Sequence, residues 1–141
     1  MAPYLRNVSC AGPAVVLLVQ PERDDRDIYA EYLSHMGLMP LCVQEATDAL
    51  RLASRADVVV TGILLPGPLD GCALIAALKR DPATRHIPIV VLTVCAWTDE
   101  EERARGTGCD VFLSKPCPPR TLFREIRSAL RARPRRIQRE R

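Results

Sequence analysis

Hydrophobic residues in this chain gather in five short runs, and a stretch with helical spacing follows each run. The runs at 14–19, 58–60 and 87–92 are apolar without alternation, which is typical of parallel strands covered by helices on both faces. Strands that alternate with helices of about 10–15 residues predict βαβ crossovers. We therefore expect an α/β fold of the (βα)5 type, with one doubly wound, five-stranded parallel sheet.

Local signals mark the ends of the predicted elements. Thr47 is a suitable N-cap for the second helix, and Thr98 with Glu101 forms the S/T-x-x-E capping box of the fourth. Gly106 is a suitable stop for that fourth helix, and Pro40 indicates that the second strand lies at a sheet edge. The predicted strands are 14–20, 38–43, 57–62, 87–93 and 111–113, and the predicted helices are 23–36, 47–53, 70–79, 98–106 and 119–134.

The length and composition indicate one globular domain. A chain of 141 residues, with 48% hydrophobic and 26% charged residues, lies close to the globular average. The longest apolar run, at 11–19, is too short to span a bilayer. Six scattered cysteines form no C-x-x-C pair, which favours reduced thiols and a cytoplasmic location. We divide the chain into an N-terminal extension (1–13), a domain (14–131) and an Arg-rich tail (132–141).

The net charge of +3 hides an asymmetry between the body and the tail. Residues 1–116 carry 11 Lys or Arg and 15 Asp or Glu, whereas residues 117–141 carry nine Arg and two Glu. A basic tail can bind a nucleic-acid backbone, an anionic membrane or an acidic protein. The Arg-rich end of the chain, RARPRRIQRER at 131–141, has no aromatic residue for base stacking and no recognition helix. We therefore expect a solvated terminus rather than one that binds nucleic acid or a membrane.

The carboxyl ends of the predicted strands should form the working site, as in other open parallel sheets. The third strand ends at Gly62, just before a Pro/Gly loop, and this end has no carboxylate, thiol or imidazole. The other ends carry Gln20-Pro21-Glu22, Thr93 and Ser114-Lys115.

Three segments, LPGPLDG at 65–71, VLTVCAW at 91–97 and CDVFLSKPC at 109–117, occur in an order that resembles the receiver domain of two-component response regulators. The resemblance spans about residues 14–131 and implies a flavodoxin-like three-layer fold. It places Gly62 at the phosphoacceptor aspartate, and Gln20 and Pro21 at the acidic pair. The matching positions that the resemblance retains are Glu22 beside the pair, Thr93 as the switch threonine, Phe112 as the switch aromatic residue and Lys115 as the family lysine.

The residues at 20, 21 and 62 depart from the family pattern, and they predict a receiver without phosphotransfer chemistry. Gly62 offers no nucleophile, and Gln20, Pro21 and a single carboxylate at Glu22 make a poor magnesium site. We therefore expect no catalytic residue, no metal, no cofactor and no enzymatic activity. Lys115, without its usual anions, should turn to Glu22, backbone carbonyls or water. A receiver phosphorylated at a non-standard residue, such as Asp70 beyond the loop, remains an alternative.

The function that this reading favours is that of a degenerate, stand-alone receiver that signals by protein–protein contact without aspartyl phosphorylation. In the family that it resembles, the surface formed by the fourth helix, fifth strand and fifth helix docks partners. Here this surface would bind a signalling protein or a second copy through Trp97, Glu101, Phe112 and Arg124. An adaptor that binds nucleic acid or an anionic membrane through the Arg-rich tail is the other alternative.

Overall fold

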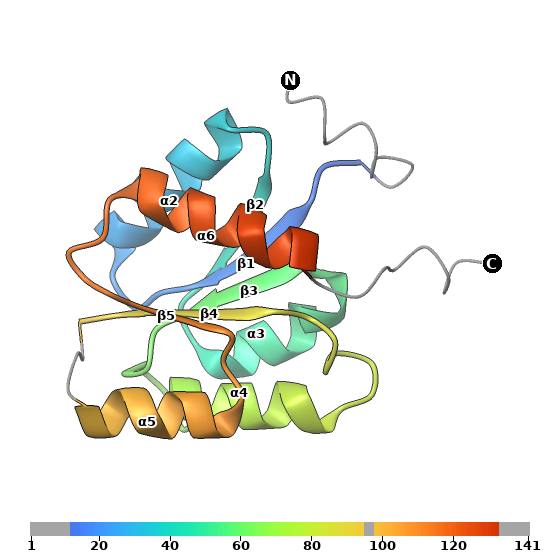
Figure 1. The fold of residues 1–141 in the computed structure, drawn as a ribbon, viewed down its shortest axis with the longest axis vertical. Helices are drawn as coiled ribbons and strands as arrows, with labels where there is room; N and C mark the ends of the chain where they lie inside the picture. Colours follow the sequence, from blue (N-terminus) through green and yellow to red (C-terminus); the bar gives the residue numbers. More distant parts are fainter. Residues whose placement is uncertain (1–11, 95–97, 133–141) are drawn as a thin grey trace.

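A computed structural model describes residues 12–94 and 98–132 as a three-layer α/β domain (Figure 1). The predicted (βα)5 arrangement is confirmed, because each of five strands is followed by helical structure. The strands are β1 (Val15–Val19), β2 (Met39–Val43), β3 (Val58–Thr61), β4 (Ile89–Thr93) and β5 (Val111–Ser114). The helices are α2 (Arg23–His35), α3 (Ala46–Leu52), a 3-10 turn η2 (Ala53–Arg55), α4 (Gly71–Arg80), α5 (Thr98–Thr107) and α6 (Pro119–Ala132).

The five strands form one parallel sheet in the order β2-β1-β3-β4-β5. Helices α2 and α6 cover one face of this sheet, and α3, α4 and α5 cover the other (Figure 1). Strand β2, with its Pro40, lies at an edge as the sequence predicts. Because all strands run the same way, their carboxyl ends meet at one edge of the sheet.

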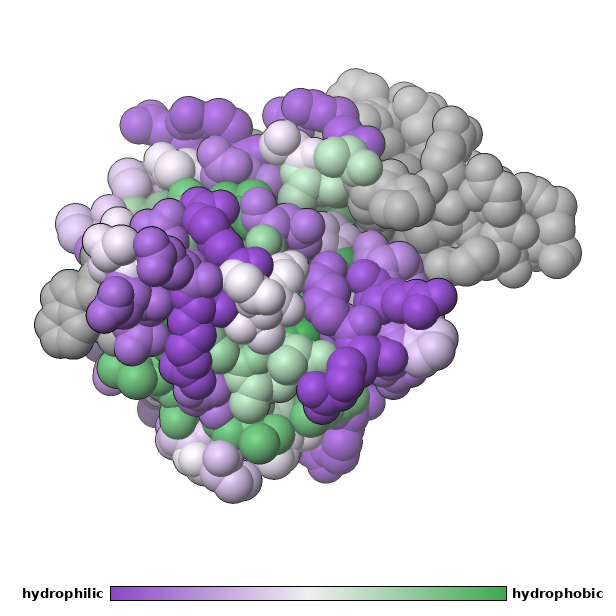
Figure 2. All heavy atoms as spheres, turned by 60° about the horizontal axis from the view of Figure 1, so that its bottom comes forward, coloured by the Kyte–Doolittle hydropathy of each residue, from purple (hydrophilic) through white to green (hydrophobic). Residues whose placement is uncertain are grey.

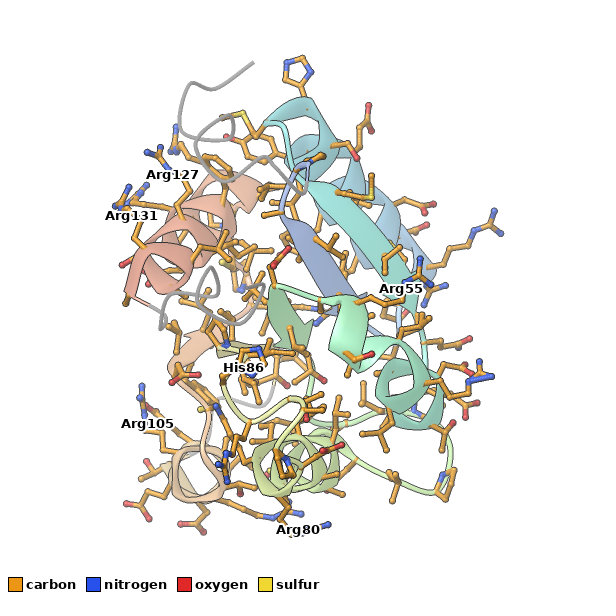
Figure 3. All side chains as sticks on the ribbon, turned by 90° about the vertical axis from the view of Figure 1, so that its right-hand side faces the viewer. Arg55, Arg80, His86, Arg105, Arg127 and Arg131 are labelled. Carbon is orange, nitrogen blue, oxygen red and sulfur yellow. The ribbon has the colours of Figure 1, made fainter. Side chains whose placement is uncertain are left out.

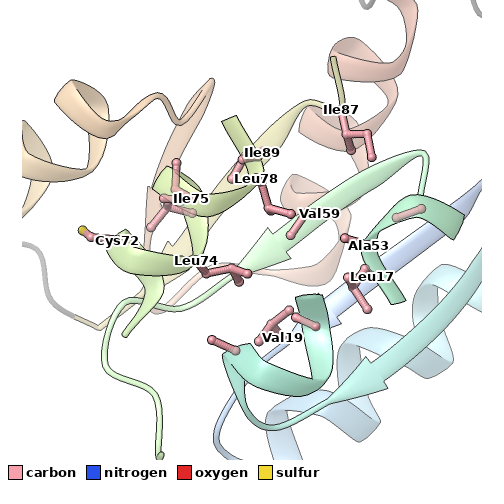
Figure 4. Close-up of a cluster of buried hydrophobic side chains, with 14 of the residues drawn as sticks. Leu17, Val19, Ala53, Val59, Cys72, Leu74, Ile75, Leu78, Ile87 and Ile89 are labelled. Carbon is pink, nitrogen blue, oxygen red and sulfur yellow. The ribbon is translucent and has the colours of Figure 1, made fainter. Parts of the chain in front are cut away.

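The sheet is buried on both faces because side chains along each strand alternate between two apolar layers. In β1, Leu17 and Val19 belong to the cluster under α3, α4 and α5, whereas Val16 and Leu18 belong to the cluster under α2 and α6. All four are fully buried. Figure 4 shows the first cluster, in which the residues of α4 pack onto β1, β3 and β4. This double burial explains why the strands lack a polar alternation.

Two predicted helix ends are wrong. Thr47 does not cap α3; Glu45 is the N-cap, and the Thr47 hydroxyl in the first turn lies 3.5 Å from Glu45 Oε1. Gly106 does not end α5, which continues to Thr107. The positive φ that ends this segment belongs to Gly108, at +121°, a conformation in which glycine avoids the strain of a Cβ atom. The capping box at Thr98 stays a prediction, because the residue before it lies outside the described part.

The side of the molecule formed by α4 and α5 has a narrow apolar strip with polar residues on either side. Figure 2 brings this side forward and shows hydrophilic residues flanking a paler and green area. The partly exposed Ala73, Ala76 and Ala77 of α4 belong to this side. Across the described residues, no helix has the length and apolarity needed to cross a membrane.

Candidate functional site

The structure brings four of the predicted site positions together at the carboxyl edge of the sheet. The backbone N–H of Gly62, just after β3, donates to the carbonyl of Val19 at 3.0 Å. Lys115, just after β5, donates its backbone N–H to the carbonyl of Thr93 at 2.9 Å. Gln20 follows β1 directly and is fully buried. The strand pairing therefore brings these four positions to the carboxyl ends of the strands, as the sequence predicts. We call this end of the sheet the mouth.

Gln20, which the resemblance places at the first position of the acidic pair, carries a neutral amide. Its Nε2 donates a hydrogen bond to the carbonyl of Leu92 at 3.1 Å. Its Oε1 is buried and has no hydrogen-bond partner among the described residues. An ionised carboxylate at this depth would face the Leu92 carbonyl without a proton to donate, so the amide suits this contact better than an acid does.

Gly62 lies on ordinary backbone with room for a first side-chain atom. A Cβ atom there would lie 3.6 Å from Leu65 Cδ2, Pro21 Cδ and the Leu92 carbonyl oxygen, which is normal van der Waals contact. Its φ is not in the left-handed region. The fold therefore does not require glycine at this position. Two of the three atoms nearest to that Cβ are apolar carbons, and the third is a carbonyl oxygen.

Two cations lie beside this mouth, and each already has partners. Arg26 Nη1 donates to the carbonyls of Gln20 at 2.8 Å and of Pro21 at 3.1 Å. Lys115 Nζ pairs with Asp25 Oδ2 at 2.5 Å, with side chains that are 13% and 35% exposed. The expected pairing of Lys115 with Glu22 is therefore wrong. Glu22 is the exposed N-cap of α2, whereas Asp25 lies on the side of that helix that faces Lys115.

A second contact ties α2 to the loop after β5. The hydroxyl of Tyr29, one turn after Asp25, donates to the carbonyl of Cys117 at 2.7 Å. Burial first, and then the neighbouring Cys117 and Asp25, raise the pKa of Tyr29 to about 12. Tyr29 therefore stays a neutral hydrogen-bond donor over the whole physiological range. The loop that carries Lys115 is held against α2 by this bond and by the ion pair.

The side chains at the mouth do not fit a magnesium ion. Magnesium prefers several hard oxygen ligands in an octahedral arrangement, usually with carboxylates among them. Here Gln20 uses its amide on Leu92, Pro21 has no side-chain donor, and the guanidinium of Arg26 contacts the backbone of both residues. In the described part of the chain, no group of three or more His, Cys, Asp or Glu could hold a metal ion.

The other predicted positions that the structure describes lie on β4, β5, α5 and α6. Thr93 is buried at the end of β4, and Phe112 in β5 is half-buried against the cluster under α3, α4 and α5. Glu101 accepts a hydrogen bond from Arg105 Nε at 3.0 Å on α5, and Arg124 is exposed on α6. Trp97 lies outside the described residues, as do residues 133–141 of the tail.

Asp70, the alternative phosphoacceptor, has both carboxylate oxygens engaged. Oδ1 accepts the backbone N–H of Ala73 at 2.8 Å, which caps α4, and Oδ2 accepts from Arg103 at 2.9 Å. These contacts indicate a structural role at the start of the helix. Sequence reasoning missed the partner Arg103, and it also missed Arg26 and Asp25. The spacing of Asp25 and Tyr29 on one helix face is the signal that could have found Asp25.

Protonation of Asp70 should lower the stability of the domain in acid. Burial opposes ionisation, but the hydrogen bond from Ala73 and the guanidinium of Arg103 outweigh it and hold the pKa of Asp70 below its usual value. A carboxylate with a lowered folded-state pKa stabilises above its unfolded pKa of about 3.9 and loses that contribution as the pH falls through the folded value. Asp70→Asn should therefore flatten the fall in unfolding free energy below about pH 4.

Urea denaturation of the wild type and Asp70→Asn between neutral and acid pH measures this difference. Asp48→Asn is a matched control, because Asp48 pairs with Arg51 on an exposed helix surface. Equal acid slopes for the wild type and Asp70→Asn would contradict the prediction.

The comparisons with known proteins agree on one family. The family model described as the response regulator receiver domain matches residues 16–127. The phosphate regulon transcriptional regulatory protein PhoB of Escherichia coli is 32% identical over 120 residues, which cover 82% of this chain. The polar-differentiation response regulator DivK of Brucella anthropi is 29% identical over 120 residues, which cover 84% of this chain and 97% of DivK. The chain spans about half, 51%, of PhoB.

Solved structures show the same fold. The signal receiver domain of a histidine kinase from Syntrophus aciditrophicus superposes with a TM-score of 0.77 at 28% identity, covering 84% of this chain and 90% of that one. A response regulator described as putative, from Chloroflexus aurantiacus, gives a TM-score of 0.79 at 23% identity and covers 84% and 98% of the two chains.

Proposed function

This chain belongs to the response regulator receiver family, and on that basis we propose that it signals by protein–protein contact without carrying an aspartyl phosphate. One observation carries the proposal. Gly62 lies at the carboxyl end of β3, where the resemblance places the phosphoacceptor, and the atoms nearest to a Cβ built there are two apolar carbons and a carbonyl oxygen. Transfer of a phosphoryl group to a receiver needs a carboxylate nucleophile there.

The charges at the mouth support the same proposal. In an intact receiver, a metal ion offsets the charge on the phosphoryl group as it moves. Here the charges are already paired within the domain, because Asp25 holds Lys115 and backbone carbonyls hold Arg26. An incoming phosphoryl group would have to displace these contacts. We infer that the domain keeps one conformation and presents it to a partner.

The partner surface that we propose consists of α5, β5 and α6. Phe112 lies half-buried in β5, on the face of the sheet that α5 covers, and Glu101 lies on α5. Arg124 on α6 and Trp97 before α5 complete the proposed set. We infer that this chain has no enzymatic activity of its own, because the proposed role uses a fixed shape and no reacting group.

A cytoplasmic location is part of the proposal. The four cysteines in the described part of the chain are free thiols. Burial is the main cause that raises the pKa of each of them, which keeps them protonated and slow to react. These four are Cys42, Cys72, Cys109 and Cys117.

Incubation with acetyl phosphate and magnesium tests the proposal. Intact-mass spectrometry of the wild type should show no phosphorylated species, and beryllofluoride with magnesium should leave the amide NMR spectrum unchanged. A receiver with the full acidic site, treated in parallel, is the positive control. A phosphorylated wild-type species, mapped to Asp70 or to any other residue, would refute the proposal.

A further inference from the structure

The side chain of Gln20 joins two strands that are not neighbours in the sheet. The pairing of β1 with β3 and of β3 with β4, continued by one residue, places Gln20, Gly62 and Leu92 in one row at the mouth. Nε2 of Gln20 donates to the carbonyl oxygen of Leu92 at 3.1 Å. Since β3 lies between β1 and β4, the side chain passes the end of β3 at Gly62. We call this contact the Gln20 bridge.

The absence of a side chain at Gly62 leaves the Leu92 carbonyl open to the bridge. Side chains alternate along each strand, and this alternation places Gln20 and Gly62 on the same face, the one that α2 and α6 cover. The carbonyl oxygen that accepts the bridge lies 3.6 Å from the Cβ position of residue 62. A Cβ atom alone fits there. A β-branched side chain extends from Cβ in two directions, so it would crowd this oxygen and compete with the amide for it.

The Gln20 bridge contributes a fixed position rather than a large gain in stability. Gln20 is fully buried, and its Oε1 has no hydrogen-bond partner among the described residues. A buried polar atom without a partner opposes folding, which offsets what the hydrogen bond from Nε2 contributes. An apolar side chain of similar length would fill the same space without leaving an atom unpaired. The distinctive effect of the amide is therefore to hold the end of β4 at a set distance from β1.

The position of β4 carries over to β5 and to the loop after it. Leu92 and Thr93 pair with Leu113 and Ser114 of β5, and the N–H of Lys115 donates to the Thr93 carbonyl at 2.9 Å. Strand β5 belongs to the partner surface described above. The position of this part of the surface relative to β1 therefore depends on the Gln20 bridge.

Helix α2 closes these contacts into a ring. Arg26 Nη1 donates to the carbonyl of Gln20 at 2.8 Å, and the preceding residue on the helix, Asp25, pairs with Lys115. The ring runs from Gln20 to β4, from β4 to Lys115, from Lys115 to α2, and from α2 back to Gln20. Each member is held on two sides, so loss of the bridge would release the end of β4 from β1.

We propose that Gln20 is a positioning residue, which ties β1 to β4 past Gly62 and holds the carboxyl ends of β4 and β5 in one conformation. Glycine at residue 62 then has a second effect besides the loss of a nucleophile, because it keeps the Leu92 carbonyl open to Gln20. The link from the bridge to a partner surface rests on the proposed function, whereas the bridge itself is a contact within the domain.

Amide hydrogen exchange of the full chain, followed by NMR, tests the bridge. Gln20→Met keeps an unbranched side chain of similar length and removes the donor. In this variant, the N–H of Lys115 should exchange at least about tenfold faster than in the wild type, because the end of β4 opens more often. The urea midpoint should not fall in parallel, since the unpaired Oε1 is removed together with the hydrogen bond.

The opposite end of the same two strands supplies an internal reference. The N–H of Asp110 donates to the Ile89 carbonyl at 2.8 Å and joins β4 to β5 at their amino ends. Figure 3 views the domain from this amino end, where His86 precedes β4. The N–H of Asp110 should exchange no faster in Gln20→Met than in the wild type. Gln44→Met, at an exposed glutamine after β2, is the matched control and should change neither rate.

Substitutions at Gly62 test the shared carbonyl from the other side. Gly62→Val should also speed exchange at Lys115, because its branched side chain crowds the oxygen that the bridge uses, whereas Gly62→Ala should not. The double variant Gln20→Met/Gly62→Val should exchange at Lys115 about as fast as the faster single variant, since both changes remove one contact. A double variant whose effect is the product of the two single effects would contradict a shared contact.

Two results for Gln20→Met would overturn the inference. One is an unchanged exchange rate at Lys115. The other is an equal increase at Lys115 and Asp110 with a lower urea midpoint, because that pattern reports a general loss of stability and not a local opening. A phosphorylated wild type would refute the proposed function without altering these exchange rates, so the two failures are distinguishable.

Discussion

Gly71→Ala is expected to destabilise the domain by about 3 kcal/mol or more. A Cβ atom on residue 71 would lie 1.9 Å from the carbonyl oxygen of Gly62, 2.8 Å from Ile63 Cα and 2.9 Å from the Gly62 carbonyl carbon. All three atoms belong to the backbone, so no side chain can turn away to make room. The N–H of Gly71 also donates to the carbonyl of Ile63 at 2.7 Å, so a shift of the helix would break that bond.

Gly106→Ala is the matched control for this prediction. Gly106 lies inside α5, and a Cβ atom there would meet nothing within 4 Å. This change should stabilise by roughly 0.5–1 kcal/mol, because alanine loses less conformational freedom than glycine in a helix. Urea denaturation followed by circular dichroism measures both variants. A Gly71→Ala protein as stable as the wild type would show that α4 does not start as close to β3 as the structure places it.

The hydrophobic pattern was sufficient to predict the architecture, because burial on both faces makes the central strands apolar throughout. The predicted strand ends also indicated which residues lie together at the site. Gln20, Gly62 and Lys115 meet because parallel strands deliver their carboxyl ends to one edge. For these positions, knowing the strand boundaries to within a residue or two was enough.

The partner of Lys115 depends on the rotation of a helix, which the strand pattern does not determine. Glu22 and Asp25 are both acidic and three residues apart, so the sequence alone favours neither. The buried Tyr29 decides between them, because Asp25 lies four residues before it and shares its face. The partner of Asp70 was missed for a related reason, since Arg103 is 33 residues away on another helix.

The second large effect is expected when carboxylates are introduced at the mouth in two stages, first at Gly62 and then also at Gln20 and Pro21. Gly62→Asp alone should accept no phosphoryl group from acetyl phosphate, although its Cβ fits. The new carboxylate would lie beside Pro21 and Leu65, with Gln20 still directed at the Leu92 carbonyl. One carboxylate there cannot hold magnesium with useful affinity. The triple variant Gln20→Asp/Pro21→Asp/Gly62→Asp supplies three carboxylates, and it should become phosphorylated in the presence of magnesium.

Thermal melts with and without magnesium separate the metal site from the nucleophile. Three clustered carboxylates repel one another, so the triple variant should be less stable than the wild type without metal. Magnesium should raise its melting temperature, because a ligand that binds only the folded state stabilises it. The control Gln20→Asp/Pro21→Asp/Gly62→Asn should keep part of the magnesium response and gain no phosphoryl group. If Gly62→Asp alone is phosphorylated as fully as the triple variant, then the missing nucleophile is the whole defect. If the triple variant binds magnesium and still stays unmodified, then the pairing of Lys115 with Asp25 blocks the reaction independently of the acids.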